Sequence, residues 1–323
     1  MSGARAVTLR DIYAAQRRVR DYVEATPLRE SAWLSTIARA QVLLKLECVQ
    51  LTSSFKIRGA LNAAMRAADT SGGGTIVSAS AGNHGRAIAL AAERLGLGAV
   101  VFTPMSAPGT KKAAIRRHAA QLRDDAPDYD AAEHRAREYA ADTGAVYISP
   151  YNHPDVIAGA GTIALEILDT TPAIDAVVVP VGGGGLISGV GIALKAAAPH
   201  IRVVGVEVAA STPFAVSLQQ GAITAVDVQP SLADGLIGNL EPGSITFEFV
   251  RQYVDTLVSV SEDDLRRAIR GLAAEEHLIA EGAGATAVAA ILGGQLTDLH
   301  RAVVLVTGGN IDLRTLSGVL AGG

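Results

Sequence analysis

The sequence predicts an α/β protein in which mostly parallel, twisted sheets are flanked by helices. Short apolar strands alternate with alanine-rich helices along the chain, which is the pattern of βαβ units and a parallel sheet. Hydrophobic residues make up 49% of the chain and aromatic residues only 4%, so Ala, Val, Leu and Ile must build the core. Such a core is typical of helices packed on buried parallel strands. At 323 residues the chain is long enough for two domains.

The predicted elements follow one another with short connections. In the first half, strands are expected at 41–47, 74–80, 98–104 and 145–149, and helices at 57–69, 84–96, 109–119 and 128–144. In the second half, 161–170 leads into a strand with a glycine loop at 175–185, then a helix at 186–199 and a strand at 202–208. The segments 261–277, 282–294 and 301–310 continue the alternation. No long linker rich in Pro, Gly or Ser divides the chain, so two domains are expected to interleave.

Composition excludes several classes of function. The net charge is −4 with no block of basic residues, which argues against a nucleic-acid partner. The charged, amphipathic N-terminus shows no secretory signal, and no apolar run reaches the ~18 residues of a membrane span. Cys48 is the single cysteine, so it cannot form an internal disulfide. A reducing, cytoplasmic setting fits, with Cys48 as a small buried hydrophobic residue rather than a nucleophile.

Lys56 is an unusual lysine in this chain. Only five of the 28 basic residues are lysines, so arginine provides most of the positive charge. Lys56 stands between Phe55 and Ile57, directly after Ser53 and Ser54. A lysine amine can lose its proton when it is desolvated, whereas an arginine cannot. Lys56 is therefore either an ordinary surface charge or an amine that the chemistry needs in its neutral form.

Four consecutive glycines, Gly182 to Gly185, follow an apolar strand and precede a helix that begins near Leu186. Free backbone N–H groups and a helix N-terminus form an anion site, so this loop predicts a phosphate cradle. It lacks the Gly-Lys-Ser/Thr of a Walker A loop and the third Gly or Ala of a dinucleotide fingerprint. The phosphate could belong to a substrate or to a small cofactor, and the alternative is a tight turn, which needs only one or two glycines.

Two further corners carry polar groups at the predicted ends of strands. In "SASAGNHG" (78–85), backbone N–H groups with Ser80 and Asn83 could hold a carboxylate, and Asn83 could also donate to a phenolate oxygen. In "VTGGN" (306–310), Thr307 could offer its hydroxyl to a ring nitrogen. Ordinary turn chemistry and a helix cap are the alternatives. An amine, a phosphate cradle, a carboxylate loop and a hydroxyl together fit pyridoxal phosphate.

At this point the sequence resembles a known family, the fold-type-II pyridoxal phosphate enzymes, and within it the serine/threonine dehydratases (ammonia-lyases) and serine racemases. The segments that carry the resemblance span nearly the whole chain and are 53–63, 80–87, 153–167, 178–189, 233–236, 280–285 and 307–313. The resemblance implies a tryptophan synthase β-like fold, with a large cofactor-binding domain of residues 1–70 and 150–323. It also implies a small mobile domain of residues 71–149 that closes over the cofactor, and a homodimer.

The resemblance also implies roles for individual residues. Lys56 would carry the cofactor and, once displaced by the substrate, act as the base at Cα. The other cofactor-binding residues would be Phe55, Asn83, Gly182, Gly183, Gly184, Gly185, Leu186, Glu281 and Thr307. Phe55 would lie against the ring, Asn83 at its phenolic oxygen, and Glu281 and Thr307 at the pyridine edge. The substrate carboxylate would be held by Ser80, Ala81, Gly82, Asn83 and His84.

Three positions depart from the family pattern. Thr307 stands where the family usually has Ser or Cys, so the hydroxyl remains and a methyl is added. Ala81 stands where racemases carry a serine that serves as the acid on the second face of Cα, so a lyase is favoured. Some relatives bind a divalent ion at a glutamate matching Glu207, but the later acid is replaced by Pro213. No metal is therefore predicted, and Glu207 is expected to pair with a nearby arginine.

The implied activity is α,β-elimination of L-threonine, L-serine or both to a 2-oxo acid and ammonia, with pyridoxal 5'-phosphate as cofactor. Alternatives within the family are a dehydratase for 3-hydroxyaspartate, phenylserine or a hydroxyectoine-derived compound, and a serine racemase. A non-catalytic phosphate-binding or regulatory protein is the alternative from another class, and Lys56 itself argues against it.

Overall fold

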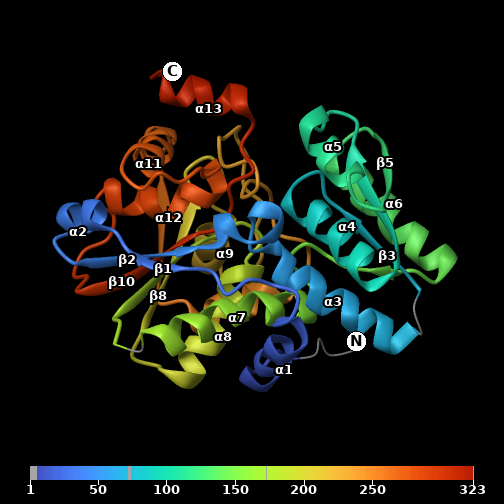
Figure 1. Cartoon of the computed structure of the whole chain (residues 1–323), viewed down its shortest axis with the longest axis horizontal. Coiled ribbons are helices and arrows are strands. Elements are labelled where there is room, and N and C mark those ends of the chain that lie inside the picture. The colour runs from blue at the N-terminus through green and yellow to red at the C-terminus, as the bar shows by residue number, and fades with distance from the viewer. Residues whose placement is uncertain (1–5, 72–73, 172, 323) are drawn as a thin grey trace.

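A six-stranded sheet forms the centre of the protein. The computed structural model describes residues 6–71, 74–171 and 173–322, and Figure 1 shows its elements. The strand order is β1-β2-β10-β7-β8-β9. Every neighbouring pair is parallel except β1 and β2. The strands are β1 (Leu28–Glu30), β2 (Gln41–Leu46), β7 (Ala176–Pro180), β8 (Arg202–Val208), β9 (Thr256–Val260) and β10 (Arg301–Val306).

Helices cover both faces of this sheet, which is why its inner strands are apolar without alternation. Val304 packs into the core on one face and its neighbour Leu305 into the core on the other. The first face is covered by α2 (Ala32–Ala38), α11 (Glu262–Ala274), α12 (Gly282–Leu292) and α13 (Leu313–Leu320). The second is covered by α1 (Leu9–Val19), α7 (Pro154–Thr170), α8 (Gly185–Ala197), α9 (Pro213–Gln220) and α10 (Ile245–Tyr253).

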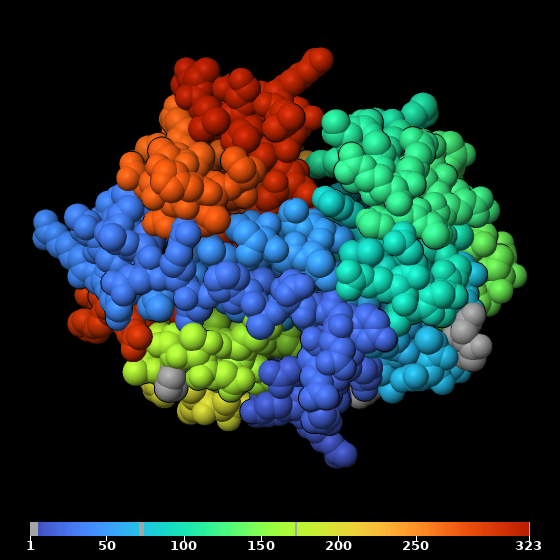
Figure 2. Space-filling view, viewed as in Figure 1, coloured from blue at the N-terminus to red at the C-terminus, as the bar shows by residue number. Residues whose placement is uncertain are grey.

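A second, four-stranded sheet is inserted between residues 75 and 147. Its order is β5-β4-β3-β6 and all pairs are parallel. The elements are β3 (Thr75–Ala79), α4 (Asn83–Leu95), β4 (Gly98–Pro104), α5 (Gly109–Arg116), β5 (Gln121–Ala126), α6 (Tyr129–Thr143) and β6 (Val146–Tyr147). We call residues 75–147 the small body and the remaining described residues the large body. Figure 2 shows the surface notched between the small body and the C-terminal part of the chain.

Helix α3 (Lys56–Ser71) joins the two bodies. Its buried face packs with α4 and α5 in one apolar cluster, to which Val156 of α7 also belongs. Two glycines let α3 and α7 approach closely. A Cβ at Gly59 would lie 2.7 Å from the Val156 carbonyl oxygen, and one at Gly159 would lie 2.5 Å from the Arg58 carbonyl oxygen. Backbone contacts as close as these exclude larger residues.

A buried cluster of charges fixes the first turn of α3. The Arg58 guanidinium is fully buried and lies 2.8 Å from the Glu47 carboxylate and 2.6 Å from that of Glu166. The Lys45 amine donates to Glu166 at 2.5 Å, and the Thr26 hydroxyl donates to Glu47 at 2.5 Å. Two positive and two negative groups thus balance in the interior. Because they come from β2, the short helix η1 (Glu47–Val49), α3 and α7, they tie four elements together.

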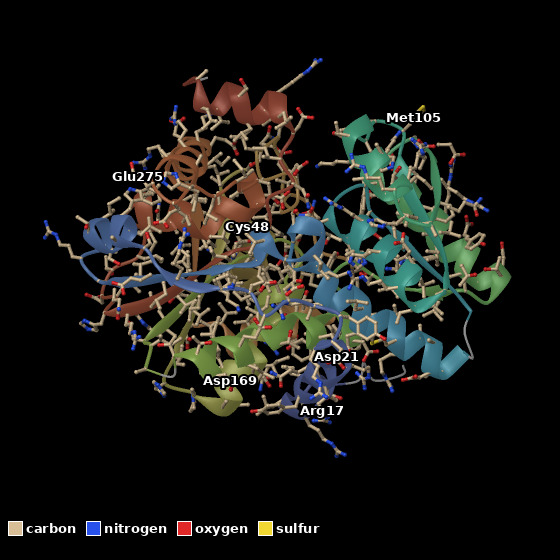
Figure 3. The ribbon with its side chains drawn as sticks, in the orientation of Figure 1. Arg17, Asp21, Cys48, Met105, Asp169 and Glu275 are labelled. Carbon is tan, nitrogen blue, oxygen red and sulfur yellow. The ribbon has the colours of Figure 1, made fainter. Side chains whose placement is uncertain are left out.

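The predicted fold class is confirmed, and most predicted elements lie within a few residues of their positions. The strand expected at 175–185 is shorter, and the helix before it begins at Pro154 rather than near 161. The segment 277–281, between α11 and α12, is a loop. Cys48 is buried in the interior, whereas Arg17 and Glu275 lie at the periphery (Figure 3). Within the described residues, none of the helices combines the length and apolar composition that crossing a bilayer requires.

Candidate active site

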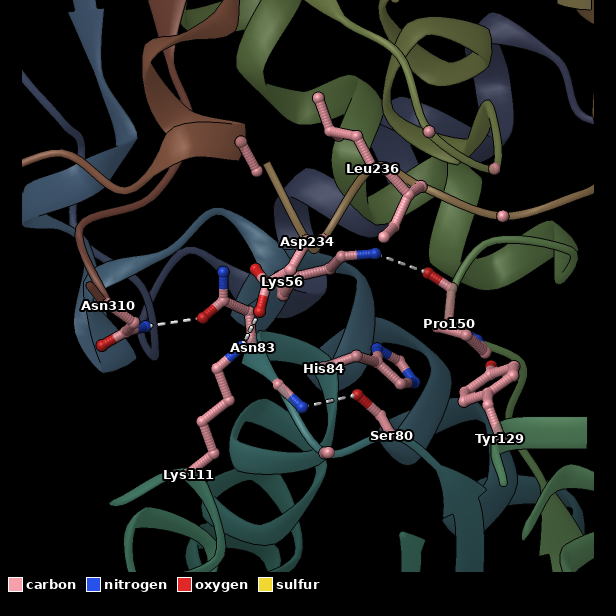
Figure 4. Close-up of a pocket in the computed structure, with 18 of the residues that line it drawn as sticks. Lys56, Ser80, Asn83, His84, Lys111, Tyr129, Pro150, Asp234, Leu236 and Asn310 are labelled. Atoms are coloured by element: carbon pink, nitrogen blue, oxygen red, sulfur yellow. Dashed lines mark hydrogen bonds and ion pairs between the residues drawn. The ribbon is translucent and has the colours of Figure 1, made fainter. Parts of the chain in front are cut away.

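One large cavity lies between the two bodies, with a volume of about 1990 Å³. Figure 4 shows how side chains from both bodies converge on it. All the predicted site residues line it: Phe55, Lys56, Ser80, Ala81, Gly82, Asn83, His84, Gly182, Gly183, Gly184, Gly185, Leu186, Glu281 and Thr307. The carboxyl ends of strands in both sheets point to this space, as expected for ligand sites in parallel sheets.

Lys56 is presented to the cavity by a sharply turned segment. Thr52 and Ser53 have positive φ angles of 63° and 54°, in the left-handed backbone region that residues other than glycine rarely adopt. The chain then pairs with the corner after β10, because the Phe55 N–H donates to the Thr307 carbonyl at 3.1 Å. Lys56 follows as the first residue of α3. The predicted lysine and the predicted Thr307 corner are therefore held together by backbone pairing.

The environment of Lys56 makes its amine easier to deprotonate. Its Nζ donates to the Pro150 carbonyl at 2.9 Å and lies 5.2 Å from the centre of the Phe55 ring. Burial lowers the pKa of Lys56 from 10.5 to about 8, while the charge of Glu281 opposes the shift. An arginine could not be deprotonated by such burial, which explains why a lysine stands here.

The loop between β3 and α4 presents backbone N–H groups to the cavity. No side chain caps the first turn of α4 within the described residues, and Gly82 occupies the cap position. The Gly82 N–H donates to the Ser80 hydroxyl at 3.2 Å. His84 is buried with its Nε2 3.4 Å from the Ile148 carbonyl oxygen, and burial lowers its pKa to about 3. A neutral imidazole offers no charge to a carboxylate, so His84 would serve such a ligand through its backbone.

The glycine loop forms a second uncapped helix start. Gly184 has a φ of 82°, α8 begins at Gly185, and no side chain caps this end within the described residues. A Cβ on Gly183 would lie 2.3 Å from the Tyr151 ring, and one on Gly184 would lie 2.5 Å from that of Phe214. Close packing thus explains part of the glycine run, in line with the tight-turn alternative. The unpartnered helix start facing the same cavity as Lys56 fits a phosphorylated cofactor as well.

Glu281 and Thr307 lie at the far side of the cavity, both buried. Glu281 accepts a hydrogen bond from the Asn83 side-chain amide at 2.5 Å, and its own N–H donates to the Gly308 carbonyl at 3.0 Å. Burial raises the pKa of Glu281 to about 7, and the Asn83 hydrogen bond opposes the shift. The Thr307 hydroxyl donates to the Ala283 carbonyl at 3.3 Å. The Thr307 oxygen can still accept a hydrogen bond, because a hydroxyl has two lone pairs.

A family model described as pyridoxal-phosphate dependent enzyme matches residues 19–308. The chain belongs to this family. Its cofactor is pyridoxal 5'-phosphate, as predicted, and the amine, the uncapped helix start and the shared cavity described above fit that group.

Relatives of this pyridoxal-phosphate dependent enzyme match it over nearly its whole length. The L-threonine ammonia-lyase of Thermotoga maritima is 40% identical over 314 residues, which are 97% of this chain and 78% of the relative. The catabolic L-threonine dehydratase TdcB of Escherichia coli K12 is 37% identical, covering 96% of this chain and 95% of the relative.

Solved structures agree with the same fold. The processed form of threonine deaminase isoform 2 from Solanum lycopersicum superposes with a TM-score of 0.89 at 33% identity, over 98% of this chain and 92% of the other. Maize serine racemase superposes with a TM-score of 0.92 at 33% identity, over 98% of each chain. The tryptophan synthase β-like architecture expected from the resemblance is therefore confirmed.

Glu207 does not line the cavity of this enzyme. Its carboxylate accepts hydrogen bonds from the backbone N–H groups of Phe214 at 2.9 Å and Ala215 at 3.0 Å, so it caps the start of α9. The interpretation that it pairs with an arginine is therefore wrong. Both oxygens are already used, and burial raises the pKa of Glu207 to about 7.

Several cavity residues of the enzyme escaped the sequence analysis. The Pro150 carbonyl receives the Lys56 amine, Tyr151 packs on the glycine loop, and Asn310 donates to Asn83. Pro150 and Tyr151 sit in a loop after a weak strand, where no sequence pattern marks a contact. Asn310 lies within the "TGGN" motif, so the motif itself was the available signal.

Proposed function

We propose that this protein is a pyridoxal-phosphate-dependent lyase that removes the β-hydroxyl and the amino group of L-threonine, L-serine or both, giving a 2-oxo acid and ammonia. The observation that carries the proposal is the Lys56 amine, whose pKa burial lowers to about 8, in a cavity that also contains two uncapped helix starts. The curated relatives named as threonine ammonia-lyases and dehydratases support the same reaction.

Each group of the site has a task in this reaction. Pyridoxal phosphate, when bound, supplies the electron sink that makes the Cα proton of the amino acid acidic. Lys56 would take that proton, because its lowered pKa leaves a useful fraction of neutral amine. The N–H groups of the Ser80–His84 loop would orient the substrate carboxylate, and those of the Gly182–Leu186 loop would hold the cofactor phosphate. Phe55 would pack against the ring, with Thr307 at its nitrogen.

Ala81 favours elimination over racemisation. A racemase needs a base that removes the Cα proton on one face and an acid that returns a proton on the other, whereas elimination needs one base on one face. Ala81 lines the cavity but carries no group that can transfer a proton. Serine racemase is the second candidate because maize serine racemase shares the fold. Installing the hydroxyl with Ala81→Ser should raise the conversion of L-serine to D-serine while 2-oxo acid release continues, as measured by chiral chromatography.

The two bodies would act as domains that close over the substrate. We propose residues 71–149 as the small mobile domain and residues 1–70 with 150–323 as the large one; residues 1–5, 72–73, 172 and 323 lie outside the described part of the chain. Lys111 of α5 pairs with Asp234, and Arg137 of α6 pairs with Glu241 at 3.0 Å. These ion pairs cross between the bodies and would favour the closed arrangement, which excludes water from the chemistry. We further propose a cytoplasmic homodimer.

A substrate panel tests the proposal. The purified protein is supplied with pyridoxal phosphate and incubated with L-threonine, L-serine, 3-hydroxyaspartate, phenylserine and a hydroxyectoine-derived compound, and 2-oxo acid release is measured for each. Fastest release from threonine or serine is expected. Release only from another member would reassign the substrate, and no release from any would support a non-catalytic role. Lys56→Ala is the matched control and should lose both the activity and the visible absorption band of the bound cofactor.

A further inference from the structure

A directed chain of hydrogen bonds passes through the side-chain amide of Asn83 and ends at the Glu281 carboxylate. It runs from Arg86 to Asn310, from Asn310 to Asn83, and from Asn83 to Glu281 (Figure 4 shows the Asn310–Asn83 step). We propose that Asn310 and Arg86 are positioning residues that fix the amide of Asn83 with its NH2 group directed toward Glu281 and the cofactor. This inference rests on the proposed role of Asn83 in cofactor binding.

The orientation of Asn310 is set by two partners that each have a single hydrogen-bonding role. The Arg86 guanidinium can only donate, and its terminal nitrogen lies 2.6 Å from the Asn310 Oδ1. The Thr52 carbonyl can only accept, and it lies 2.7 Å from the Asn310 Nδ2. Turning the Asn310 amide over would place its NH2 against the guanidinium and its oxygen against the carbonyl. Both contacts would become repulsive, so Asn310 has one orientation.

The orientation of Asn83 follows from that of Asn310. The Asn310 Nδ2 lies 2.7 Å from Asn83, so the facing atom of Asn83 must be its oxygen. The NH2 group of Asn83 then lies on the other side, where Glu281 accepts from it at 2.5 Å. An amide NH2 carries two hydrogens, and Glu281 is its one acceptor within the described residues. The second hydrogen is therefore left to donate to an oxygen in the cavity. The phenolic oxygen of the cofactor is an acceptor of this kind, and its negative charge strengthens such a hydrogen bond.

The chain of bonds also connects the two bodies. Asn83 and Arg86 stand three residues apart on the first turn of α4, on the same side of the helix. Asn310, Thr52 and Glu281 belong to the large body. The amide is thus fixed when α4 lies against the corner after β10. The side chains of Asn83, Arg86 and Asn310 are only half-buried, so water competes for them when the bodies separate.

The first test uses a variant that keeps the shape of the Asn310 side chain and removes its hydrogen-bond donor. Asn310→Asp still accepts from Arg86 but cannot donate to Asn83, so it unlocks the amide. We expect the dissociation constant of pyridoxal phosphate, measured by titrating the apoprotein and following absorbance, to rise at least tenfold. We also expect the pH titration of the bound cofactor's visible band to shift. Asn239→Asp is the matched control, since it adds the same charge at an exposed position on the rim of the same cavity.

Arg86 provides a second, independent pair of variants. Arg86→Leu removes the donor that orients Asn310 and should weaken cofactor binding in the same direction, with the same shift of the band. Arg86→Lys keeps a donor and should recover most of both effects, which a loss of packing alone would not. If Asn310→Asp fails to fold, the Arg86 pair decides the question by itself.

Unchanged binding and an unchanged band in folded Asn310→Asp and Arg86→Leu would overturn the inference. Equal effects in Asn239→Asp would overturn it too, because the added charge would then be the cause. If the proposed function is wrong, the result is different, because the wild-type protein would then release no 2-oxo acid. The dissociation constants of pyridoxal phosphate for the wild type and the variants could still be measured and compared.

Discussion

Replacing Arg58 by methionine tests whether the protein's stability depends on equal numbers of positive and negative charges in the buried cluster. Arg58→Met removes one positive charge and leaves the fully buried Glu47 with the Thr26 hydroxyl as its one side-chain partner among the residues that the structure describes. Glu166 is less affected, since the Lys45 amine still contacts it at 2.5 Å. Removing one partner of a buried ion pair costs about 3–5 kcal/mol, because the other charge stays buried without compensation. We therefore expect the free energy of unfolding to fall by that amount.

The assay is urea unfolding followed by circular dichroism, with the cofactor at one fixed saturating concentration so that binding contributes equally to every variant. The double variant Arg58→Met with Glu47→Gln is the control, because it leaves Lys45 and Glu166 as a balanced pair. It should be more stable than Arg58→Met alone by about 1 kcal/mol or more. A loss below about 1 kcal/mol in the single variant, or no recovery in the double variant, would refute the reasoning.

Three further predictions follow from single contacts. The rate at which the apoprotein captures pyridoxal phosphate covalently should rise with pH through a midpoint near 8, the pKa of Lys56, and stopped-flow absorbance showing a midpoint near 10.5 would contradict this. Gly183→Ala should weaken cofactor binding more than tenfold, because its methyl would collide with Tyr151; Gly109→Ala, whose Cβ meets nothing within 4 Å, should bind normally. The raised pKa of Glu207 means that the folded protein holds a proton that the unfolded chain releases between pH 4.5 and 7, so stability should fall across this range by up to about 3 kcal/mol. In Glu207→Gln, melting temperatures should lose this part of the pH dependence, and an identical profile in both proteins would disprove it.

The strands that the sequence analysis missed share a position in the fold. β1, β5 and β9 are all edge strands. Continuous apolar runs mark central strands, because helices bury both faces of such strands. Edge strands carry charges that discourage pairing with other chains, and β5 with the sequence QLRDDA illustrates this. Asp124 of β5 pairs with Lys112 and Arg116 of α5 instead of entering a core. Charged edge strands of this kind are recognised from their pairing with a neighbouring strand in the structure, not from an apolar run in the sequence.

The site was largely predictable because its parts are local. The glycine loop and the Ser80–His84 loop each combine a strand end and a helix start within a few residues. Lys56 stands out as a rare lysine between apolar neighbours, and the resemblance decides its role. What the sequence could not predict are contacts between distant segments. Arg86 and Asn310 are 224 residues apart, and Lys56 meets the Pro150 carbonyl across 94 residues. No local pattern marks such partners, because they are brought together only by the packing of the two bodies.

The order of strands in the large sheet has a consequence for how the chain is made. β2 pairs with β10, so Gln41 lies beside Arg301, and β10 in turn separates β2 from β7. During synthesis β2 must therefore wait, with one edge unpaired, until nearly the whole chain has left the ribosome. The four strands of the small body are contiguous in sequence and have all their partners much earlier. A chain that stops before residue 301 can complete the small sheet but leaves β2 with β1 alone, an exposed template for aggregation.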